Sequence, residues 1–182
     1  MIRDTIILIL RKIRIFTGNS LNIYYMITID LPQYKKPIEI ENLMLDYNGT
    51  LAIDGVLIPK VEEMLIEISK KLNIYIITAD TFGLVKAQLK NIPCNLKILE
   101  STNQSEAKLN FLNSINSSKT ICIGNGFNDS LMLKNSIIGI SVIQKEGASV
   151  NAINSADIVC FSIIDALELI NNPLRIKATL RN

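Results

Sequence analysis

The sequence contains no histidine and no tryptophan, and only three cysteines in 182 residues. Without histidine, the chain cannot form a histidine-ligated metal site, a histidine general base or a Ser-His-Asp triad from its own residues. Cys94, Cys122 and Cys160 are odd in number and form no C-x-x-C pair, which argues against a zinc site or a disulfide framework. Acid–base chemistry must therefore use carboxylates, Lys, Tyr or Cys, and a metal site must be rich in oxygen or built on Cys.

The sequence also lacks strong charge and long apolar runs. Lys and Arg number 19 against 17 Asp and Glu, so the net charge is +2, and there is no long basic stretch. This balance gives no electrostatic support for nucleic acid or an anionic membrane as a partner. The apolar run at residues 5–10 is too short to span a bilayer, and no small-residue cleavage site is evident. With isolated cysteines, these features favour a reduced, cytoplasmic protein.

Residues 1–25 allow two interpretations. Apolar side chains spaced by three and four residues form a helical stripe, namely Ile2, Ile6, Ile9, Ile13 and Phe16. Such a stripe is typical of a short amphipathic helix at an interface or a membrane surface. The alternative, which we favour, is an N-terminal extension that results from a start site placed too early, because Met26 opens a well-formed stretch. We then expect residues 26–182 to form a single domain.

From residue 38 onward, short apolar runs alternate with longer amphipathic ones. The runs predict strands at residues 38–45, 73–78, 96–99, 120–123, 137–143 and 157–161. They predict helices at residues 59–72, 82–89, 105–115, 129–134, 148–153 and 163–170, with the last helical region broken at Pro173. Strands that are apolar throughout are typical of a parallel sheet covered on both faces. The predicted fold is therefore α/β, with a doubly wound, Rossmann-like parallel sheet.

Polar residues follow three of these strands. In doubly wound sheets, ligands bind at the carboxyl ends of the strands, where Asp46, Thr78 and residues 124–129 fall. Asp46 precedes a glycine-containing turn, which suits a carboxylate nucleophile with backbone N–H groups around a phosphate. Thr78 offers a hydroxyl, Lys108 offers a cation, and residues 124–129 form an oxygen-rich loop suited to Mg²⁺.

The order of these motifs resembles that of the haloacid dehalogenase superfamily of phosphotransferases. Within it, the chain looks most like soluble proteins similar to the catalytic domain of P-type ATPases. Asp46-Tyr-Asn-Gly-Thr50 parallels the D-K-T-G-T phosphorylation motif, and Thr78-Ala-Asp80 parallels T-G-D. Lys108 parallels the lysine of the third motif, and Gly124-Asn-Gly-Phe-Asn-Asp129 parallels G-D-G-x-N-D. The resemblance spans residues 38–165.

The resemblance implies a role for each matching position. Asp46 would attack phosphorus and form an aspartyl-phosphate, while Thr78 and Lys108 would hold the phosphate. Mg²⁺ would be the cofactor, and its ligands would be Asp46, Asn48 through its backbone carbonyl, Asn125 and Asp129. The remaining cofactor-binding positions would be Gly49, Thr50, Ala79 and Asn128, and Asn128 would either orient Asp129 or form the turn. Tyr47 would project near the entrance.

Two positions depart from the family pattern. Phosphatases of the superfamily usually carry an acid–base Asp where this chain has Asn48, and an amide can neither donate nor accept that proton. Asn48 therefore favours substrates whose leaving group needs no proton, namely phosphoanhydrides such as ATP or activated phosphate esters. Asn125 replaces an Asp ligand, so we expect weaker Mg²⁺ binding. Because the chain is rich in asparagine, a slow or inactive binding or regulatory module is the alternative.

The spacing of the motifs predicts no cap domain. Residues 51–77 provide one loop, a helix and a strand, and residues 81–107 are similarly used up. An uncapped site would be open to water and to bulky substrates. The expected partner is a phosphorylated small molecule or nucleotide, or a phosphoprotein, and the sequence defines no oligomeric state. A third interpretation makes the chain a partner of a membrane transporter, with residues 1–25 as its docking helix.

Overall fold

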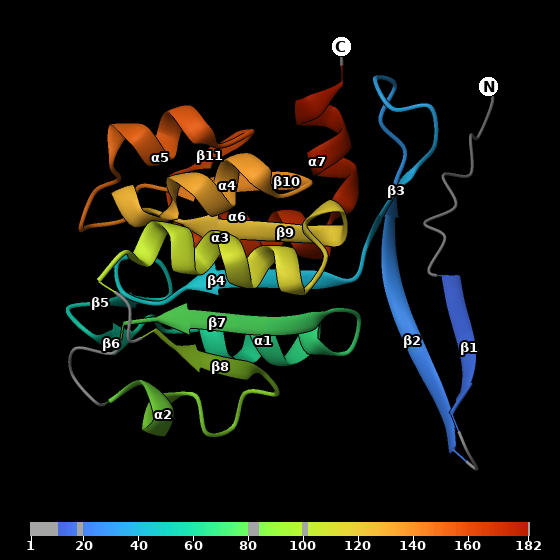
Figure 1. Ribbon diagram of the computed structural model, residues 1–182, viewed down its shortest axis with the longest axis horizontal. Coiled ribbons are helices and arrows are strands. Elements are labelled where there is room, and N and C mark those ends of the chain that lie inside the picture. Colours follow the sequence, from blue (N-terminus) through green and yellow to red (C-terminus); the bar gives the residue numbers. More distant parts are fainter. Residues whose placement is uncertain (1–10, 18–19, 80–83, 100–101, 182) are drawn as a thin grey trace.

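The computed structural model describes residues 11–17, 20–79, 84–99 and 102–181. Its centre is a six-stranded parallel sheet of order β11-β10-β9-β4-β7-β8. The strands are β4 (Asn42–Asp46), β7 (Asn73–Thr78), β8 (Asn95–Ile98), β9 (Thr120–Gly124), β10 (Ile138–Val142) and β11 (Ile158–Cys160). All of them point toward the same edge (Figure 1). The predicted parallel α/β architecture is confirmed.

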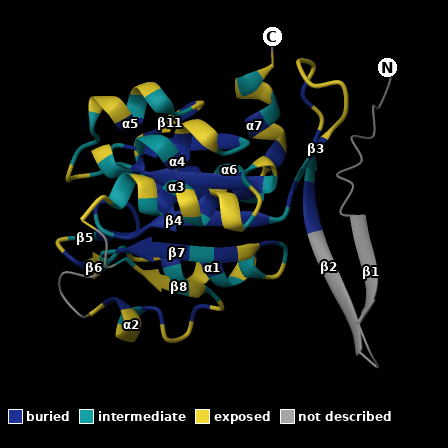
Figure 2. Cartoon of the chain, in the orientation of Figure 1, coloured by how far each residue is buried: buried dark blue, intermediate teal, exposed yellow. Residues whose placement is uncertain are grey.

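Helices cover both faces of this sheet. One face packs against α1 (Val61–Ser69), α6 (Ile163–Asn171) and α7 (Pro173–Leu180). The other packs against α3 (Gln104–Ser114), α4 (Ser130–Asn135) and α5 (Val150–Ser155). Alternation along β4 explains the two layers, since Leu43 and Leu45 join the first core cluster and Met44 joins the second. Figure 2 shows the inner strands β4, β7, β9 and β10 as largely buried, in agreement with their apolar sequences, whereas the edge strand β8 is mostly exposed.

The N-terminal segment forms strands, so the predicted helix is wrong where the structure describes it. Strands β1 (Arg11–Thr17), β2 (Ser20–Ile29) and β3 (Ile38–Ile40) form an antiparallel sheet. Ile13 and Ile15 alternate with charged residues, which is the period of two typical of a strand. The helical interpretation instead followed apolar residues three and four positions apart. Figure 1 places this sheet at the end of the molecule opposite the tips of the parallel strands. Residues 1–10 of the predicted stripe lie outside the described residues.

The strand predicted at residues 38–45 is two strands in two different sheets. The break falls at Glu41, whose backbone N–H donates to the carbonyl of Lys119 at 3.0 Å and whose carbonyl accepts from Asn73 at 2.9 Å. Its carboxylate also lies 2.5 Å from Lys119 Nζ. Glu41 is thus bound to both neighbouring strands of the parallel sheet, where the chain passes from β3 into β4. The apolar residues on either side of Glu41 gave one continuous strand prediction, which did not reveal this change of partner.

A short hairpin follows the Asp46 loop where the sequence predicted only a loop. It consists of β5 (Ala52–Ile53) and β6 (Val56–Leu57), joined by Asp54 and Gly55. Both turn residues have positive φ, 51° and 74°, as the tight turn favoured by an Asp-Gly pair requires. Residues 51–77 contain this hairpin, α1 and β7, and no cap domain, as predicted.

The remaining elements are short. Helix α2 (Val85–Gln88) lies within the helix predicted at residues 82–89, of which 82 and 83 fall outside the described residues. The 3₁₀ turns are η1 (Ser117–Lys119) and η2 (Phe127–Asp129). Cys122 and Cys160 are buried free thiols, as predicted for core residues. Among the described helices, none has the length and apolar character needed to cross a bilayer.

Candidate active site

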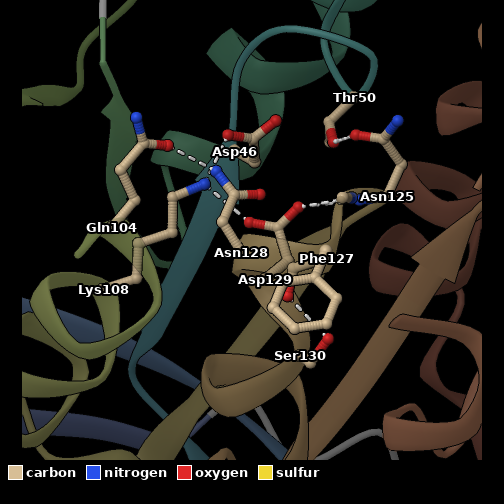
Figure 3. Close-up of polar contacts among 10 residues, drawn as sticks. Asp46, Thr50, Gln104, Lys108, Asn125, Phe127, Asn128, Asp129 and Ser130 are labelled. Atoms are coloured by element: carbon tan, nitrogen blue, oxygen red, sulfur yellow. Dashed lines mark hydrogen bonds and ion pairs between the residues drawn. The ribbon is translucent and has the colours of Figure 1, made fainter. Parts of the chain in front are cut away.

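Three charged side chains from separate motifs meet at the carboxyl edge of the sheet. Asp46 is the last residue of β4, Lys108 lies on α3, and Asp129 ends η2. Lys108 Nζ lies 2.6 Å from Asp46 Oδ1 and 2.6 Å from Asp129 Oδ1 (Figure 3). The side chains of Lys108 and Asp129 are at most 1% exposed, and that of Asp46 is 10% exposed. The convergence that the sequence predicted for these groups is present.

The charges in this cluster do not cancel when all three groups are ionised. Burial raises the pKa of Asp46 to about 6, because the attraction of Lys108 offsets only part of the desolvation and Asp129 adds repulsion. Burial alone would lower the pKa of Lys108, but the two carboxylates outweigh it and hold that pKa above its ordinary value. Two carboxylates and one ammonium leave one excess negative charge. A divalent cation would make the cluster positive and therefore attractive to phosphate.

The loop after β9 is shaped around the Asp129 carboxylate. Asp129 Oδ2 accepts hydrogen bonds from the backbone N–H groups of Asn125, at 3.0 Å, and Gly126, at 2.8 Å. A Cβ atom on Gly124 would lie only 2.5 Å from Asp129 Cγ. Glycine is therefore required at position 124 for the carboxylate to fold back over the strand end. The remaining oxygen, Oδ1, is left to face Lys108.

Asn125 connects two loops through both ends of its amide. Its Oδ1 accepts from Thr50 Oγ1 at 3.2 Å, and its Nδ2 donates to the carbonyl of Gly147 at 3.0 Å. A carbonyl can only accept, so this partner fixes the orientation of the amide. Gly49, with φ of 75°, gives the amide room, because a Cβ there would lie 2.4 Å from Nδ2. Asn125 Oδ1 keeps a second lone pair, and its role as a metal ligand stays a prediction.

Asn48 differs from Asn125, because its Oδ1 is buried without a hydrogen-bond partner. A buried acceptor of this kind fits a site completed by a bound cation, water or ligand donor. The carboxylates of Asp46 and Asp129 are hard oxygen donors of the kind that Mg²⁺ prefers. Within the described ranges, no group of three or more His, Cys, Asp or Glu is placed to hold a metal. The resemblance implies amide and backbone oxygens, from Asn125 and Asn48, as the other ligands.

The other predicted site residues lie around this cluster. Thr78 ends β7, one residue beyond Ile77, which pairs with Asp46, and its side chain is buried. Ala79 follows it and is half-buried, whereas Asp80 lies outside the described residues. Thr50 is fully buried. Tyr47 is 1% exposed within the core, so its expected place at the entrance is wrong.

Asn128 contacts a residue that the sequence analysis missed, and its role in orienting Asp129 stays a prediction. Asn128 Nδ2 donates to Gln104 Oε1 at 2.7 Å, which joins η2 to the helix that carries Lys108 (Figure 3). Gln104 precedes Lys108 by four residues on α3, so both lie on one helical face, a spacing that could have revealed it. Gly147 was also missed, and no local sequence signal marks it.

The parallel sheet and its two helix layers give the chain a haloacid dehalogenase-like α/β fold. No family model matches the chain. The cobalt-bound deoxy-D-mannose-octulosonate 8-phosphate phosphatase from Haemophilus influenzae superposes with a TM-score of 0.61 and 12% identity, over 76% of this chain and 90% of that one. A 3-deoxy-D-manno-octulosonate 8-phosphate phosphatase from Moraxella catarrhalis, in complex with magnesium, phosphate and the sugar acid, gives a TM-score of 0.57 and 19% identity, over 77% and 92%. At these identities the likeness shows a shared fold.

Sequence similarity places the chain in a particular family. It is 55% identical over 64 residues to the uncharacterized protein MJ0073 of Methanocaldococcus jannaschii, a match that covers 35% of this chain and 69% of that protein. The chain belongs to the family of this archaeal protein.

Proposed function

We propose that the protein is a Mg²⁺-dependent phosphohydrolase that acts through an aspartyl-phosphate on Asp46. The observation that carries this proposal is the buried Lys108, held 2.6 Å from both Asp46 and Asp129 at the carboxyl edge of the sheet. The shared fold supports it, because the two solved proteins described above are phosphatases, one with bound magnesium and phosphate.

The chain's own residues supply a nucleophile and a phosphate site. An Asp46 carboxylate oxygen forms a bond to phosphorus as the bond from phosphorus to the leaving-group oxygen breaks, and water later releases phosphate from Asp46. Lys108 neutralises part of the charge, and Thr78 donates its hydroxyl to a phosphate oxygen. Bound by Asp46, Asp129 and the Asn48 carbonyl, Mg²⁺ would screen the repulsion between carboxylate and phosphate.

Asn48 directs the choice of substrate within this proposal. Its amide cannot protonate a leaving alkoxide, so anhydrides such as ATP and acyl phosphates, or activated esters such as p-nitrophenyl phosphate, would react faster than ordinary monoesters. The same preference fits the resemblance to soluble P-type ATPase-like proteins. That finer family assignment is part of the proposal and rests on the motif pattern. The substrate would be a phosphorylated small molecule, a nucleotide or a phosphoprotein.

A direct assay tests the proposed activity. Purified full chain with Mg²⁺ is given acetyl phosphate, ATP or p-nitrophenyl phosphate, and phosphate release is compared between wild type and Asp46→Asn. As a matched control, Asp30→Asn changes an exposed carboxylate outside the site, which pairs with Lys177 at 3.1 Å. We expect release by wild type and the control, loss in Asp46→Asn, and loss on chelation. Equal rates in wild type and Asp46→Asn would overturn the mechanism.

A second candidate is a regulatory module that carries phosphate on Asp46 with little turnover. The buried, unpartnered Asn48 Oδ1 favours it, because the position usually occupied by the acid–base Asp holds an amide. Acid-stable labelling of Asp46 without phosphate release would support this candidate. Asn48→Asp distinguishes the two further, since it should raise turnover of an ordinary monoester such as glycerol phosphate. A fall in that rate would show that the amide is suited to its own reaction.

A further inference from the structure

The hairpin that follows the Asp46 loop is held from outside by polar side chains. Gln88, on α2, receives a hydrogen bond from the Leu57 N–H at 2.6 Å and donates one to the Gly55 carbonyl at 2.7 Å. Its amide thereby pairs with β6 much as a neighbouring strand would. Gln88 is 31 residues from Leu57 in the sequence, so this contact is a long-range tertiary one.

Other contacts fix the hairpin on the side of the loop after β10. The Asp54 N–H donates to Glu146 Oε1 at 2.8 Å, and Gln144 Nε2 donates to the Thr50 carbonyl. Of these anchors, Gln88 is the one that binds β6 with both ends of its side chain. Releasing it would free the β6 side of the hairpin while the opposite side stays attached.

The hairpin is continuous with the residues beside the nucleophile. Gly49 N–H donates to the Ala52 carbonyl at 2.9 Å, and the N–H groups of Leu51 and Ala52 both donate to the Tyr47 carbonyl. Asn48 also forms a bridge with Ala52. A shift of β5 and β6 would therefore be transmitted to Asn48 and Gly49. Figure 1 places the hairpin at the same edge as the tips of the parallel strands.

We propose that Gln88 is a positioning residue that holds the β5–β6 hairpin, and through it residues 48–50, in register with Asp46. It does so without contacting the reacting atoms, through the Leu57 and Gly55 backbone. This inference rests on the proposed function and extends it, because it assigns a role in turnover to a residue that belongs to none of the phosphate-binding motifs. Lys108 and Thr78 belong to α3 and β7 rather than to the hairpin, so we expect the chemical step to be affected more than substrate binding.

The test uses Gln88→Leu, which removes both hydrogen bonds at similar volume, and Gln88→Glu, which keeps the acceptor for Leu57. Loss of both hydrogen bonds in Gln88→Leu should lower kcat about tenfold or more, with KM changed less than about twofold. Gln88→Glu should restore part of kcat. The matched control is Gln33→Leu, which removes a 3.0 Å side-chain hydrogen bond to the Leu180 carbonyl and should leave kcat unchanged.

Hydrogen exchange makes the test independent of turnover. In Gln88→Leu the amides of residues 49–57 should exchange faster than in wild type, whereas those of β9 should be unchanged. Faster exchange with an unaltered kcat would overturn the positioning role, as would unaltered exchange at residues 49–50. A wild-type chain without turnover would refute the proposed function instead, and exchange at residues 49–50 would then decide whether Gln88 positions the loop.

Discussion

Replacing Asp46 by asparagine should stabilise the metal-free protein while it abolishes the proposed chemistry. The wild-type cluster contains two buried carboxylates and one buried ammonium, so one negative charge is uncompensated. Asp46→Asn leaves Lys108 and Asp129 as a balanced pair, 2.6 Å apart. An amide oxygen can still accept a hydrogen bond from Lys108 Nζ. The substitution therefore removes a buried charge and keeps the shape of the site.

The raised pKa of Asp46 gives the size of the effect. Ionising Asp46 at pH 7 in a folded site whose pKa is about 6, against 3.8 ordinarily, disfavours folding by about 3 kcal/mol. The pKa of Asp46 is higher in the folded than in the unfolded chain, so protonated Asp46 favours the folded state. This contribution to stability is fully present below pH 3.8 and is lost as the pH rises through about 6. In a chain of this size the gain in Asp46→Asn corresponds to about 6–12 °C in Tm at pH 7.

Thermal unfolding in the presence of chelator measures this difference at pH 7 and again near pH 4, where the advantage of Asp46→Asn should nearly vanish. Asp30→Asn is the control, and should show no gain because its carboxylate is exposed and pairs with Lys177. Added Mg²⁺ should raise the Tm of wild type more than that of Asp46→Asn. A metal-free Asp46→Asn that melts at or below the wild-type temperature at pH 7 would refute the charge imbalance.

Other substitutions test the remaining parts of the site. Lys108→Met should lower the free energy of unfolding by about 3–5 kcal/mol in urea titrations, because it leaves two carboxylates buried without a cation; unchanged stability would count against the ion pairs. Asn125→Asp should cost about 1–3 kcal/mol, since a carboxylate oxygen would face the Gly147 carbonyl; tighter Mg²⁺ binding with full stability would contradict the bridging role. Gly124→Ala should lower phosphate release strongly, because its Cβ would displace the Asp129 carboxylate; near wild-type kcat would show that the loop adapts.

The sequence predicts the central sheet and the charged cluster for the same physical reason. Apolar runs mark strands buried on both faces, and parallel strands bring their carboxyl ends to one edge. Asp46 and Lys108 are separated by 62 residues, yet their side chains meet because of that topology. Gln88 lacked any such signal. Its partners are the backbone groups of Gly55 and Leu57, and a side chain–backbone contact leaves no complementary residue pattern in the sequence.

The incorrect helix near the N-terminus has a different origin. The helical pattern, with apolar residues three and four apart, extends over residues 2–16. The strand pattern, with every second residue apolar, is confined to Ile13 and Ile15. Isoleucine fits both patterns, and its branched Cβ favours the extended one. Pairing decides the outcome, because β1 finds β2 across a short connection and β2 in turn pairs with β3. Which strand a segment pairs with depends on the tertiary structure, and the spacing of apolar residues does not specify it.

The two asparagines that depart from the phosphatase pattern look alike in sequence, since each precedes a glycine, but the structure separates them. Asn125 uses its Oδ1 with Thr50 and its Nδ2 with Gly147, so aspartate would fit its surroundings less well. Loss of function by drift toward asparagine does not explain a residue whose amide is used at both ends. Asn48 Oδ1 is buried and unpartnered, a condition that costs about 1–3 kcal/mol. No hydrogen bond of the Asn48 Oδ1 explains why this position holds an amide. Asn48 is therefore the residue that decides whether the phosphate on Asp46 is released or retained.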